Sequence, residues 1–486
     1  MAYHLIMGLE VHVQLNTKTK LFCRCLNEYV PNEPNKNICV FCTGQPGALP
    51  LLNKEAVKKA IIFGVAIGAK IPDNTRWDRK NYFYPDLPTG YQISQYDNPI
   101  VEGGKIEFYV ESDGGKSSKK HSINLTRAHL EADAGKLLHV GDKTLVDFNR
   151  SGCPLIEIVS EPELRSAAEA MAYVSELQLL VRTLGISDAD MEKGQMRFDC
   201  NISLQTDEEF ESGKLPGYRV EMKNINSIRA VGRAIEAETI RQRELLEKGE
   251  LPVQETRGWR DDLNKSMSQR SKEQAHDYRY FPEPDLQILE IKPSDLPDVA
   301  SLPILPNFKR EEFLAMGLNL QTANTFVTQP EVGELFNKSV LNMDLPQNLV
   351  KTVANIVTTN LIALATKLEK PIADILTAEQ LLDLASMYAD KKINNQGVIK
   401  ALELLNAAPE KKVQVAVEAE GLLQLSDETA LEGFVDNVIK MNPTVVEQYK
   451  SGKVQVIGFL VGACMKQSLG QGNPEAFKRL LLVKLG

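Results

Sequence analysis

The chain has 486 residues, of which 43% are hydrophobic and 25% are charged, and its formal net charge is −9. This length predicts about three domains, and the charged fraction is that of a globular protein with a large core. No run of about 18 apolar residues occurs, and the start, MAYHLIMGLEVHVQL, lacks the regions of a cleavable signal peptide, so we expect a cytoplasmic protein without a membrane span. The acidic balance excludes a general attraction to polyanions, so a nucleic-acid partner must meet a local basic patch.

The first predicted strand alternates apolar and ionisable residues. Glu10 and His12 interleave with apolar neighbours, and the same alternation recurs over residues 127–133, 196–204 and 219–223. Residues two apart in a strand share a face, so these runs predict an antiparallel sheet with one apolar and one ionisable face. A solvated sheet face is the alternative interpretation. Asp and Asn are depleted from strands, however, so the pattern favours a catalytic face.

The cysteines of the chain divide into a cluster and three scattered residues. Four of the seven form a C-x-C pair followed by a C-x-x-C pair, at Cys23, Cys25, Cys39 and Cys42. In a cytoplasmic chain this spacing favours a metal site over disulfides, and four thiolates suit tetrahedral Zn²⁺. The alternative is a remnant of such a site, with four unliganded cysteines.

Helices interrupt the strand signals of the first half. Asn53 is a predicted helix cap, Ser166 and Glu169 form a capping box before a helix that ends at Gly185, and a third helix is predicted over about 227–249. Helices between antiparallel strands predict an α+β arrangement with the apolar sheet face under the helices.

The composition changes after a proline-spaced link. Beyond it the chain is rich in Ala, Leu, Lys, Glu and Gln with helical periodicity, and a second break falls near Pro409. We therefore expect an N-terminal antiparallel-sheet catalytic cradle with covering helices over residues 1–292, followed by two all-helical domains over 296–409 and 410–486.

The standard nucleotide-binding motifs are missing, because the sequence contains neither G-x-x-x-x-G-K-[ST] nor G-x-G-x-x-G after a strand. Other motifs occur in a specific order: GLEVHVQLNTKTKLFCRC, CVFCTGQPGALPLLN, DRKNYFYPDLPTGYQISQ, RAHLEADAGKLLH, FNRSGCPLIEIVSEPEL, GQMRFDCNISL and HDYRYFPEPDL. In this order they resemble the B-subunit family of the heterotrimeric aspartyl/glutamyl-tRNA amidotransferases. The resemblance covers essentially the whole chain, and NPTVVEQYKSGKVQVIGFLVG is similar to the family's helical tRNA-binding tail domain.

The resemblance implies an ATP-dependent ligase that acts in two steps on mischarged tRNA. The side-chain carboxylate of Glu-tRNA(Gln), Asp-tRNA(Asn) or both is phosphorylated with ATP and Mg²⁺, and ammonia then displaces phosphate. The implied partners are an amidase subunit that releases ammonia from glutamine and a small bridging subunit. The alternatives are a non-catalytic tRNA-binding scaffold subunit of the same complex and, less favoured, a free-standing zinc-dependent RNA-binding protein.

The chemistry joins two anions, ATP and a carboxylate, so hard cations and Arg or Lys clamps are needed. The predicted catalytic residues are Glu10, His12, His129, Glu131, Asp133, Arg197, Asp199 and Lys223. The predicted Mg²⁺ ligands are Glu10, His12, Glu131 and Asp133, although His12 would instead suit the orientation of a carboxylate or water. The predicted ATP- or substrate-binding residues are Arg79, Lys80, Asn81, Tyr82, Tyr91, Gln92, Ser94, Arg150, Asn201, Glu221 and Asn224.

One position departs from the family motif H-x-E-E-D-A-G-K, because Ala132 replaces its second Glu. Strand alternation predicts that Ala132 points away from Glu131 and Asp133, which would leave the ionisable face intact. A turn of the backbone there would instead mean that a ligand or an ammonia-channel carboxylate is lost. In the tail, tRNA contacts are expected from Lys440, Lys450, Lys453, Lys466, Lys478 and Arg479.

Overall fold

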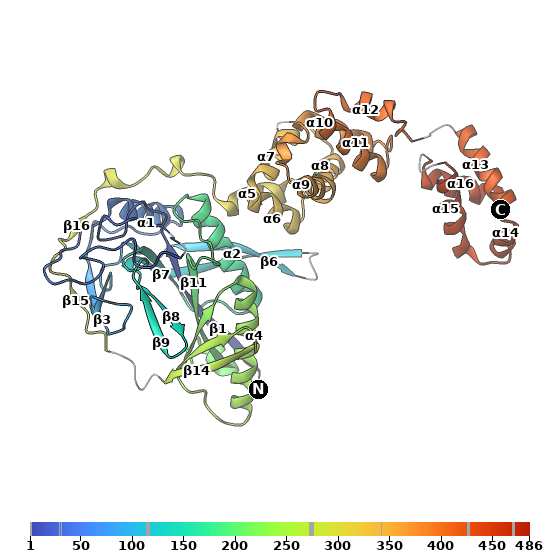
Figure 1. The fold of residues 1–486 in the computed structure, drawn as a ribbon. Helices are drawn as coiled ribbons and strands as arrows, with labels where there is room; N and C mark the ends of the chain where they lie inside the picture. Colours follow the sequence, from blue (N-terminus) through green and yellow to red (C-terminus); the bar gives the residue numbers. More distant parts are fainter. Residues whose placement is uncertain are drawn as a thin grey trace. The chain divides into compact units, whose positions relative to one another are not determined.

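The computed structural model describes residues 2–28, 30, 32–112, 117–271, 277–341, 343–424, 428–468 and 472–486. The chain divides into two compact units, Met1–Lys309 and Arg310–Gly486 (Figure 1). The first unit carries the strands and the second is helical, so the predicted α+β class with a helical C-terminal part is confirmed.

One sheet organises the first unit, and its central strands are the alternating segments of the sequence. Strand β6 (Lys105–Ser112) pairs with β7 beside this sheet. In spatial order the other strands are β14 (Lys265–Ser271), β13 (Glu255–Arg260), β12 (Val220–Ile225), β11 (Met196–Thr206), β1 (Tyr3–Gln14), β10 (Pro154–Ser160), β7 (Ser117–Ala132) and β5 (Val101–Glu102).

The sheet departs from a purely antiparallel arrangement at one pair, because β12 and β13 run parallel. The segment that joins these two strands contains α4 (Ile228–Glu247). Parallel neighbours need a crossover connection of this kind, usually a helix, whereas antiparallel neighbours can be joined by a short turn.

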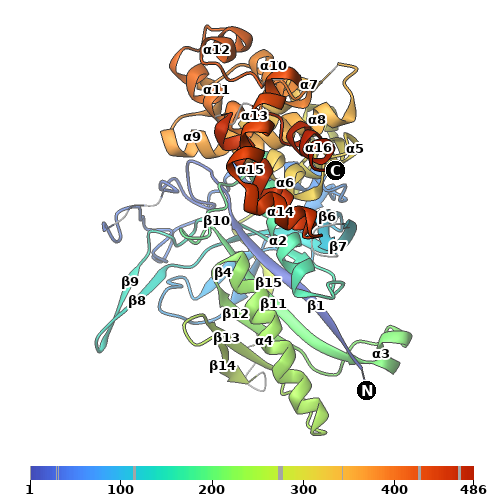
Figure 2. The ribbon, with the colours of Figure 1, turned by 90° about the vertical axis from the view of Figure 1, so that its right-hand side faces the viewer.

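The apolar face of the sheet packs under helices whose starts are set by side-chain caps. Helix α1 (Lys54–Ala66) is capped by Asn53, α2 (Ala167–Thr183) by Ser166, and α4 by Ser227. Helix α4 contacts β11, and α2 contacts β6 and α4 (Figure 2). The buried residues of the strands and helices form one hydrophobic cluster, which leaves the ionisable side chains on the opposite face. A short helix, α3 (Asp207–Ser212), follows β11.

Smaller sets of strands complete the first unit. A small sheet has the order β15 (Phe281–Pro282), β3 (Asp78–Asn81) and β4 (Tyr91–Ser94). Its strand β4 is tied to the main sheet, because Gln92 Nε2 donates a hydrogen bond to the Ala132 carbonyl at 2.8 Å. The remaining pairs are β16 (Leu289–Glu290) with β2 (Asn74–Thr75), and the hairpin of β8 (Lys136–Val140) and β9 (Lys143–Asp147).

The second unit consists of helices. Helix α5 (Pro306–Ala315) spans the boundary between the units. It is followed by α6 (Leu320–Thr328), α7 (Pro330–Val340), α8 (Gln347–Asn355), the π-helical segment Ile356–Leu361, α9 (Ile362–Leu368), α10 (Ala378–Ala389), α11 (Asn395–Ala407), α12 (Val413–Ala419), α13 (Glu428–Met441), α14 (Pro443–Lys450), α15 (Ile457–Gln467) and α16 (Pro474–Leu485). Helices α13, α15 and α16 share a hydrophobic cluster of their own. The predicted boundary near residue 410 stays a prediction.

One continuous helix of the second unit is long and apolar. In the part of the chain that the structure describes, only Gln347–Leu368 meets the length and composition of a membrane span. Interior helices of ordinary helical domains meet the same criterion, and this one packs against α7, α10 and α11.

The packing of β1 gives a testable consequence for stability. Leu9 is 0% exposed at the centre of the sheet. Leu9→Ala should lower the free energy of unfolding of the first unit by about 2–5 kcal/mol, because it removes buried methyl groups and leaves a cavity. Urea unfolding followed by Trp fluorescence measures this change. Leu251→Ala, at a position 78% exposed, is the matched control, and equal midpoints for the two variants would contradict this packing.

Candidate active site and cysteine cluster

The register of three adjacent strands aligns the ionisable residues in a row. His12 of β1 lies opposite Glu157 of β10 on one side and opposite Arg197 of β11 on the other. His129 of β7 lies opposite Glu157 from the far side. Backbone pairing alone therefore places two histidines on either side of one carboxylate.

A second row lies two residues along the same strands. Glu10 of β1 is opposite Asp199 of β11, and two residues further along β11 Asn201 is opposite Glu221 of β12. Asn201 Nδ2 donates a hydrogen bond to Glu10 Oε1 at 2.9 Å. The sheet thus carries two groups of carboxylates on its ionisable face.

The first group consists of His12, Glu131 and Glu157, whose donor atoms all lie within 4.8 Å of one another. His12 Nε2 is 3.3 Å from Glu157 Oε2 and 3.6 Å from Glu131 Oε1. His129 lies behind them, with its Nε2 3.5 Å from Glu157 Oε2 and 3.9 Å from Glu131 Oε2. A Ser94 Oγ contact at 3.5 Å also reaches Glu131 Oε2. This arrangement of one imidazole and two carboxylates suits a small divalent cation.

The two histidines have opposite protonation behaviour. Burial acts against the charged ring of His12, but the hydrogen bond and charge of Glu157, joined by the charge of Glu131, raise its pKa to about 9. Burial lowers the pKa of His129 to about 4, because the nearby cations Arg127 and Lys80 add to burial and outweigh Glu157. At neutral pH and without a metal ion, His12 is therefore charged and His129 is neutral.

The carboxylates of the first group are also shifted in opposite directions. Burial and the charge of Glu157 raise the pKa of Glu131. Burial opposes the charge on Glu157, but the two imidazoles that face it hold the pKa of this carboxyl well below its ordinary value. Two buried carboxylates this close repel each other, so a cation between them is stabilising.

The second group consists of Glu10, Asp199 and Glu221. Burial and the charges of Glu157 and Asp199 raise the pKa of Glu10. A lysine already occupies part of this group, because Lys223 Nζ is 2.7 Å from Asp199 Oδ2 and 3.1 Å from Glu221 Oε1. The first group is therefore a better candidate for binding a metal ion than the second group.

Asp133 lies apart from both groups of carboxylates. Its two oxygens pair with Arg197 Nη2 at 3.0 Å and with Arg150 Nε at 3.4 Å. Arg150 is held further by the carbonyls of Ala134 and Gly135. The four residues predicted to form one Mg²⁺ site are thus distributed over three places, and Asp133 is placed to orient two guanidinium groups.

Ala132 points to the apolar side, as alternation predicts, because it packs against the hydrophobic cluster of the sheet. Its carbonyl accepts the hydrogen bond of Gln92. The replacement of Glu by Ala in this motif therefore leaves Glu131 and Asp133 on the ionisable side of the strand.

A cavity of about 370 Å³ is lined by His12 and Glu131 of the first group and by Asp199 of the second. Its basic side chains come from four separate segments, and Lys80 Nζ lies 4.9 Å above the ring of Tyr278. The predicted site residues that line the cavity are His12, Lys80, Tyr82, Gln92, Glu131, Asp133, Arg150, Arg197, Asp199, Lys223 and Asn224. An adjoining cavity of about 270 Å³ is lined in part by Glu10 and Asn201.

Six predicted binding residues do not line this cavity: Arg79, Asn81, Tyr91, Ser94, Asn201 and Glu221. Arg79 forms a bidentate pair with the buried Glu283, at 2.6 and 2.9 Å, and its guanidinium lies 4.2 Å above the ring of Tyr91. Asn81 Nδ2 donates to the carbonyl of Arg279 at 2.8 Å. This geometry gives Arg79, Asn81 and Tyr91 a bracing role between β3, β4 and the segment around β15.

Sequence reasoning missed three polar residues of the site: Glu157, Asp86 and Asn226. A signal existed for Glu157, because it is the single ionisable residue in the apolar strand PLIEIV. Asp86 and Asn226 lie in loops without periodicity, so only the folded chain shows that they face the cavity.

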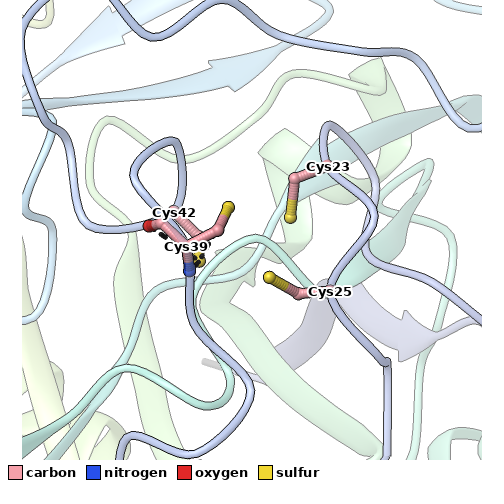
Figure 3. Close-up of side chains that lie close together, drawn as sticks. All are labelled: Cys23, Cys25, Cys39 and Cys42. Atoms are coloured by element: carbon pink, nitrogen blue, oxygen red, sulfur yellow. Dashed lines mark hydrogen bonds between the residues drawn. The ribbon is translucent and has the colours of Figure 1, made fainter.

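The four clustered cysteines converge from two loops (Figure 3). Their Sγ atoms all lie within 4.8 Å of one another, and Cys42 Sγ accepts a hydrogen bond from the Cys39 amide at 3.1 Å. The hydrogen bond from Cys23 and the charge of Lys20 lower the pKa of Cys42 to about 5, whereas burial and Cys39 raise the pKa of Cys25 to about 11. Four sulfur ligands at this spacing can hold a structural metal ion.

The six predicted tRNA-binding residues of the tail are all exposed. They lie in or beside α13 to α16 and are Lys440, Lys450, Lys453, Lys466, Lys478 and Arg479. Lys484 is also exposed and pairs with Asp436 at 2.6 Å.

Comparison with known proteins identifies the family of the chain. Residues 5–296 match the family described as the GatB/GatE catalytic domain, and residues 335–485 match the family described as the GatB domain. The chain is 44% identical over 492 residues to a protein of Coxiella burnetii (strain RSA 493 / Nine Mile phase I), with 100% of both chains covered. It is 42% identical over 497 residues to one of Picosynechococcus sp. (strain ATCC 27264 / PCC 7002 / PR-6), with 99% of this chain and 98% of the relative covered. Both relatives carry the name of the B subunit of aspartyl/glutamyl-tRNA(Asn/Gln) amidotransferase, and this chain belongs to that family of amidotransferase B subunits.

Proposed function

We propose that this chain is the ligase subunit of an ATP-dependent, tRNA-dependent amidotransferase. It phosphorylates the side-chain carboxylate of Glu-tRNA(Gln), Asp-tRNA(Asn) or both, and ammonia then displaces phosphate to give the amide. The observation that carries the proposal is the cavity of about 370 Å³, which combines four cationic side chains with Glu131, Asp133 and Asp199, in a chain of this family.

The partners follow from the same proposal. An amidase subunit supplies ammonia from glutamine, and a small third subunit connects the two in the cytoplasm. Reconstitution of the three subunits with each mischarged tRNA tests this function. ATP-dependent formation of Gln-tRNA(Gln) or Asn-tRNA(Asn) is the expected result, whereas tRNA binding without amidation would support the non-catalytic scaffold.

The cationic side chains of the cavity suit the anions of the reaction. Lys80, Arg150, Arg197 and Lys223 all line it. Preorganised cations stabilise charge that develops during transfer of a phosphoryl group, and they need no reorganisation at that moment. Asp133 keeps Arg150 and Arg197 at the cavity wall, so we assign it a positioning role.

We propose His12, Glu131 and Glu157 as the residues that hold Mg²⁺. The fit rests on their close donor atoms and on the mutual repulsion of the two buried carboxylates. When bound there, Mg²⁺ would neutralise phosphate charge. His129 packs behind these residues and orients Glu157, and Glu10 with Asp199 and Glu221 forms a second candidate cation site.

The ends of the chain have separate roles in this proposal. The exposed basic residues of α13 to α16 bind the phosphate backbone of tRNA, which makes affinity fall steeply with salt. The cysteine cluster holds one structural Zn²⁺ that joins the loop after β1 to the loop before α1.

The zinc assignment can be measured directly. Protein produced with zinc should contain one Zn²⁺ per chain by elemental analysis, and Cys25→Ser should remove it, because a tetrahedral site loses one of its four ligands. Cys464→Ala, in the tail, is the control that keeps the metal. A zinc content that is unchanged in Cys25→Ser would contradict the assignment.

Glu131→Gln tests the catalytic set. The change keeps the volume of the side chain and removes the charge, so phosphorylation of the carboxylate should fall on the order of 10²–10³-fold while tRNA affinity stays the same. Hydroxylamine trapping of the acyl phosphate measures the first step. Ala132→Glu, on the apolar side of the same strand, should destabilise the chain without raising the rate. Full activity of Glu131→Gln would show that the metal site lies elsewhere.

Metal binding should depend on pH through His12. With its pKa at about 9, His12 carries a proton at neutral pH that Mg²⁺ must displace. Apparent Mg²⁺ affinity should therefore rise up to about tenfold per pH unit between pH 7 and 9 and level off above that, since one proton is released. Calorimetric titration of the zinc-loaded chain measures this slope. His12→Gln should abolish it, and a flat profile for the unsubstituted chain would exclude His12 as a ligand.

A further inference from the structure

Two neighbouring aromatic rings face solvent in the loop between β3 and β4. Phe83 is 80% exposed, the highest value for a large apolar side chain among the residues described, and Tyr84 is 61% exposed. Neither ring forms part of the hydrophobic cluster of the sheet. A folded protein that holds such rings in water has a surface suited to binding.

The loop that carries the rings is held in place by its own turns. Leu87 N donates to the Tyr84 carbonyl at 3.0 Å, and Gly90 N donates to the Leu87 carbonyl at 3.0 Å. Gly90 has a φ of +75°, and a Cβ atom there would lie 3.2 Å from Cε1 of Phe83. The ring of Phe83 therefore lies beside Gly90, where a side chain would crowd it.

The same loop forms part of the wall of the catalytic cavity. Tyr82 and Asp86, on either side of the two rings, line that cavity. The Asp86 carbonyl accepts a hydrogen bond from Gly135 N at 2.8 Å, two residues beyond Asp133. A shallow hollow of about 540 Å³ is lined by Phe83, Tyr84, Pro85, Leu87, Pro88, Thr89 and Gly90. The hollow and the catalytic cavity are thus lined by different residues of the same braced loop.

The chemistry of the substrate determines what lies beside the cavity. In charged tRNA the amino acid is an ester of the terminal ribose, so a side-chain carboxylate inside the cavity places the last nucleotides at its rim. These nucleotides are unpaired, and unpaired bases stack on exposed aromatic rings. We propose that Phe83 and Tyr84 stack on the unpaired 3′ bases of charged tRNA and so orient the esterified amino acid towards the cavity. This inference rests on the proposed function.

The test is a binding cycle with the three-subunit complex, in which both the protein and the RNA are changed. Phe83→Ala should weaken binding of intact tRNA by roughly 5-fold or more, which corresponds to the loss of one base–aromatic stack. The same substitution should leave the affinity for tRNA trimmed of its unpaired 3′ nucleotides unchanged. Phe210→Ala, at an exposed ring that stacks on His4 of β1, is the matched control and should not affect either RNA.

Two further variants separate stacking from simple apolar contact. Phe83→Trp keeps a flat ring and should retain affinity, whereas Phe83→Leu should lose it. A 2-aminopurine in place of the terminal adenine should be quenched by the unsubstituted complex and by Phe83→Trp only. Equal losses of affinity for intact and trimmed tRNA in Phe83→Ala would overturn the proposal, and so would equal affinities of the Leu and Trp variants. Loss of the partner subunits when Phe83→Ala is purified would also overturn it, because the rings would then belong to a subunit interface.

The same preparations distinguish a failure of this inference from a failure of the proposed function. If the unsubstituted complex does not amidate mischarged tRNA with ATP, the ligase proposal is wrong. If it amidates but the effect of Phe83→Ala does not depend on the 3′ nucleotides, only the stacking proposal is wrong.

Discussion

The contact of Glu157 with two histidines is the interaction on which the site depends. His12 and His129 approach this carboxylate from the strands on either side of β10, so the contact joins three central strands of the sheet through their side chains. Because both imidazoles are buried near Lys80 and Arg127, they do not both carry a proton at neutral pH. The pKa of His12 is raised and that of His129 is lowered, so only His12 is charged. The charge state of this group of side chains is therefore set by the pairing of the strands.

Around this contact, one set of residues holds in place the strands and side chains that form the cavity. Arg79 and Asn81 brace the small sheet, Asp133 fixes two arginines, and Gln92 ties the small sheet to β7. Each of these contacts holds a loop or a guanidinium at the wall of one cavity. Sites built on strands and held by such surrounding bonds keep their geometry better than sites carried by free loops.

The sequence allowed the sheet and much of the site to be predicted, because a strand has a fixed period of two. That period placed Glu10, His12 and Glu131 on one face before any contact was known. It did not show which arginine meets which carboxylate. Arg79 meets Glu283 across 204 residues of sequence and Arg197 meets Asp133 across 64, and such pairings depend on how distant strands are brought together. For the same reason, the predicted four-residue metal site became three separate arrangements.

The high pKa of His12 also has a consequence for the folding of the chain. Folding buries the carboxylates of Glu131 and Glu157 close together, and unbalanced charge there would oppose folding. A proton on His12 supplies a positive charge at the same place and at the pH of the cell. If this group binds Mg²⁺, as proposed, loading is an exchange of a proton for a metal ion in a folded chain, so folding does not have to wait for magnesium.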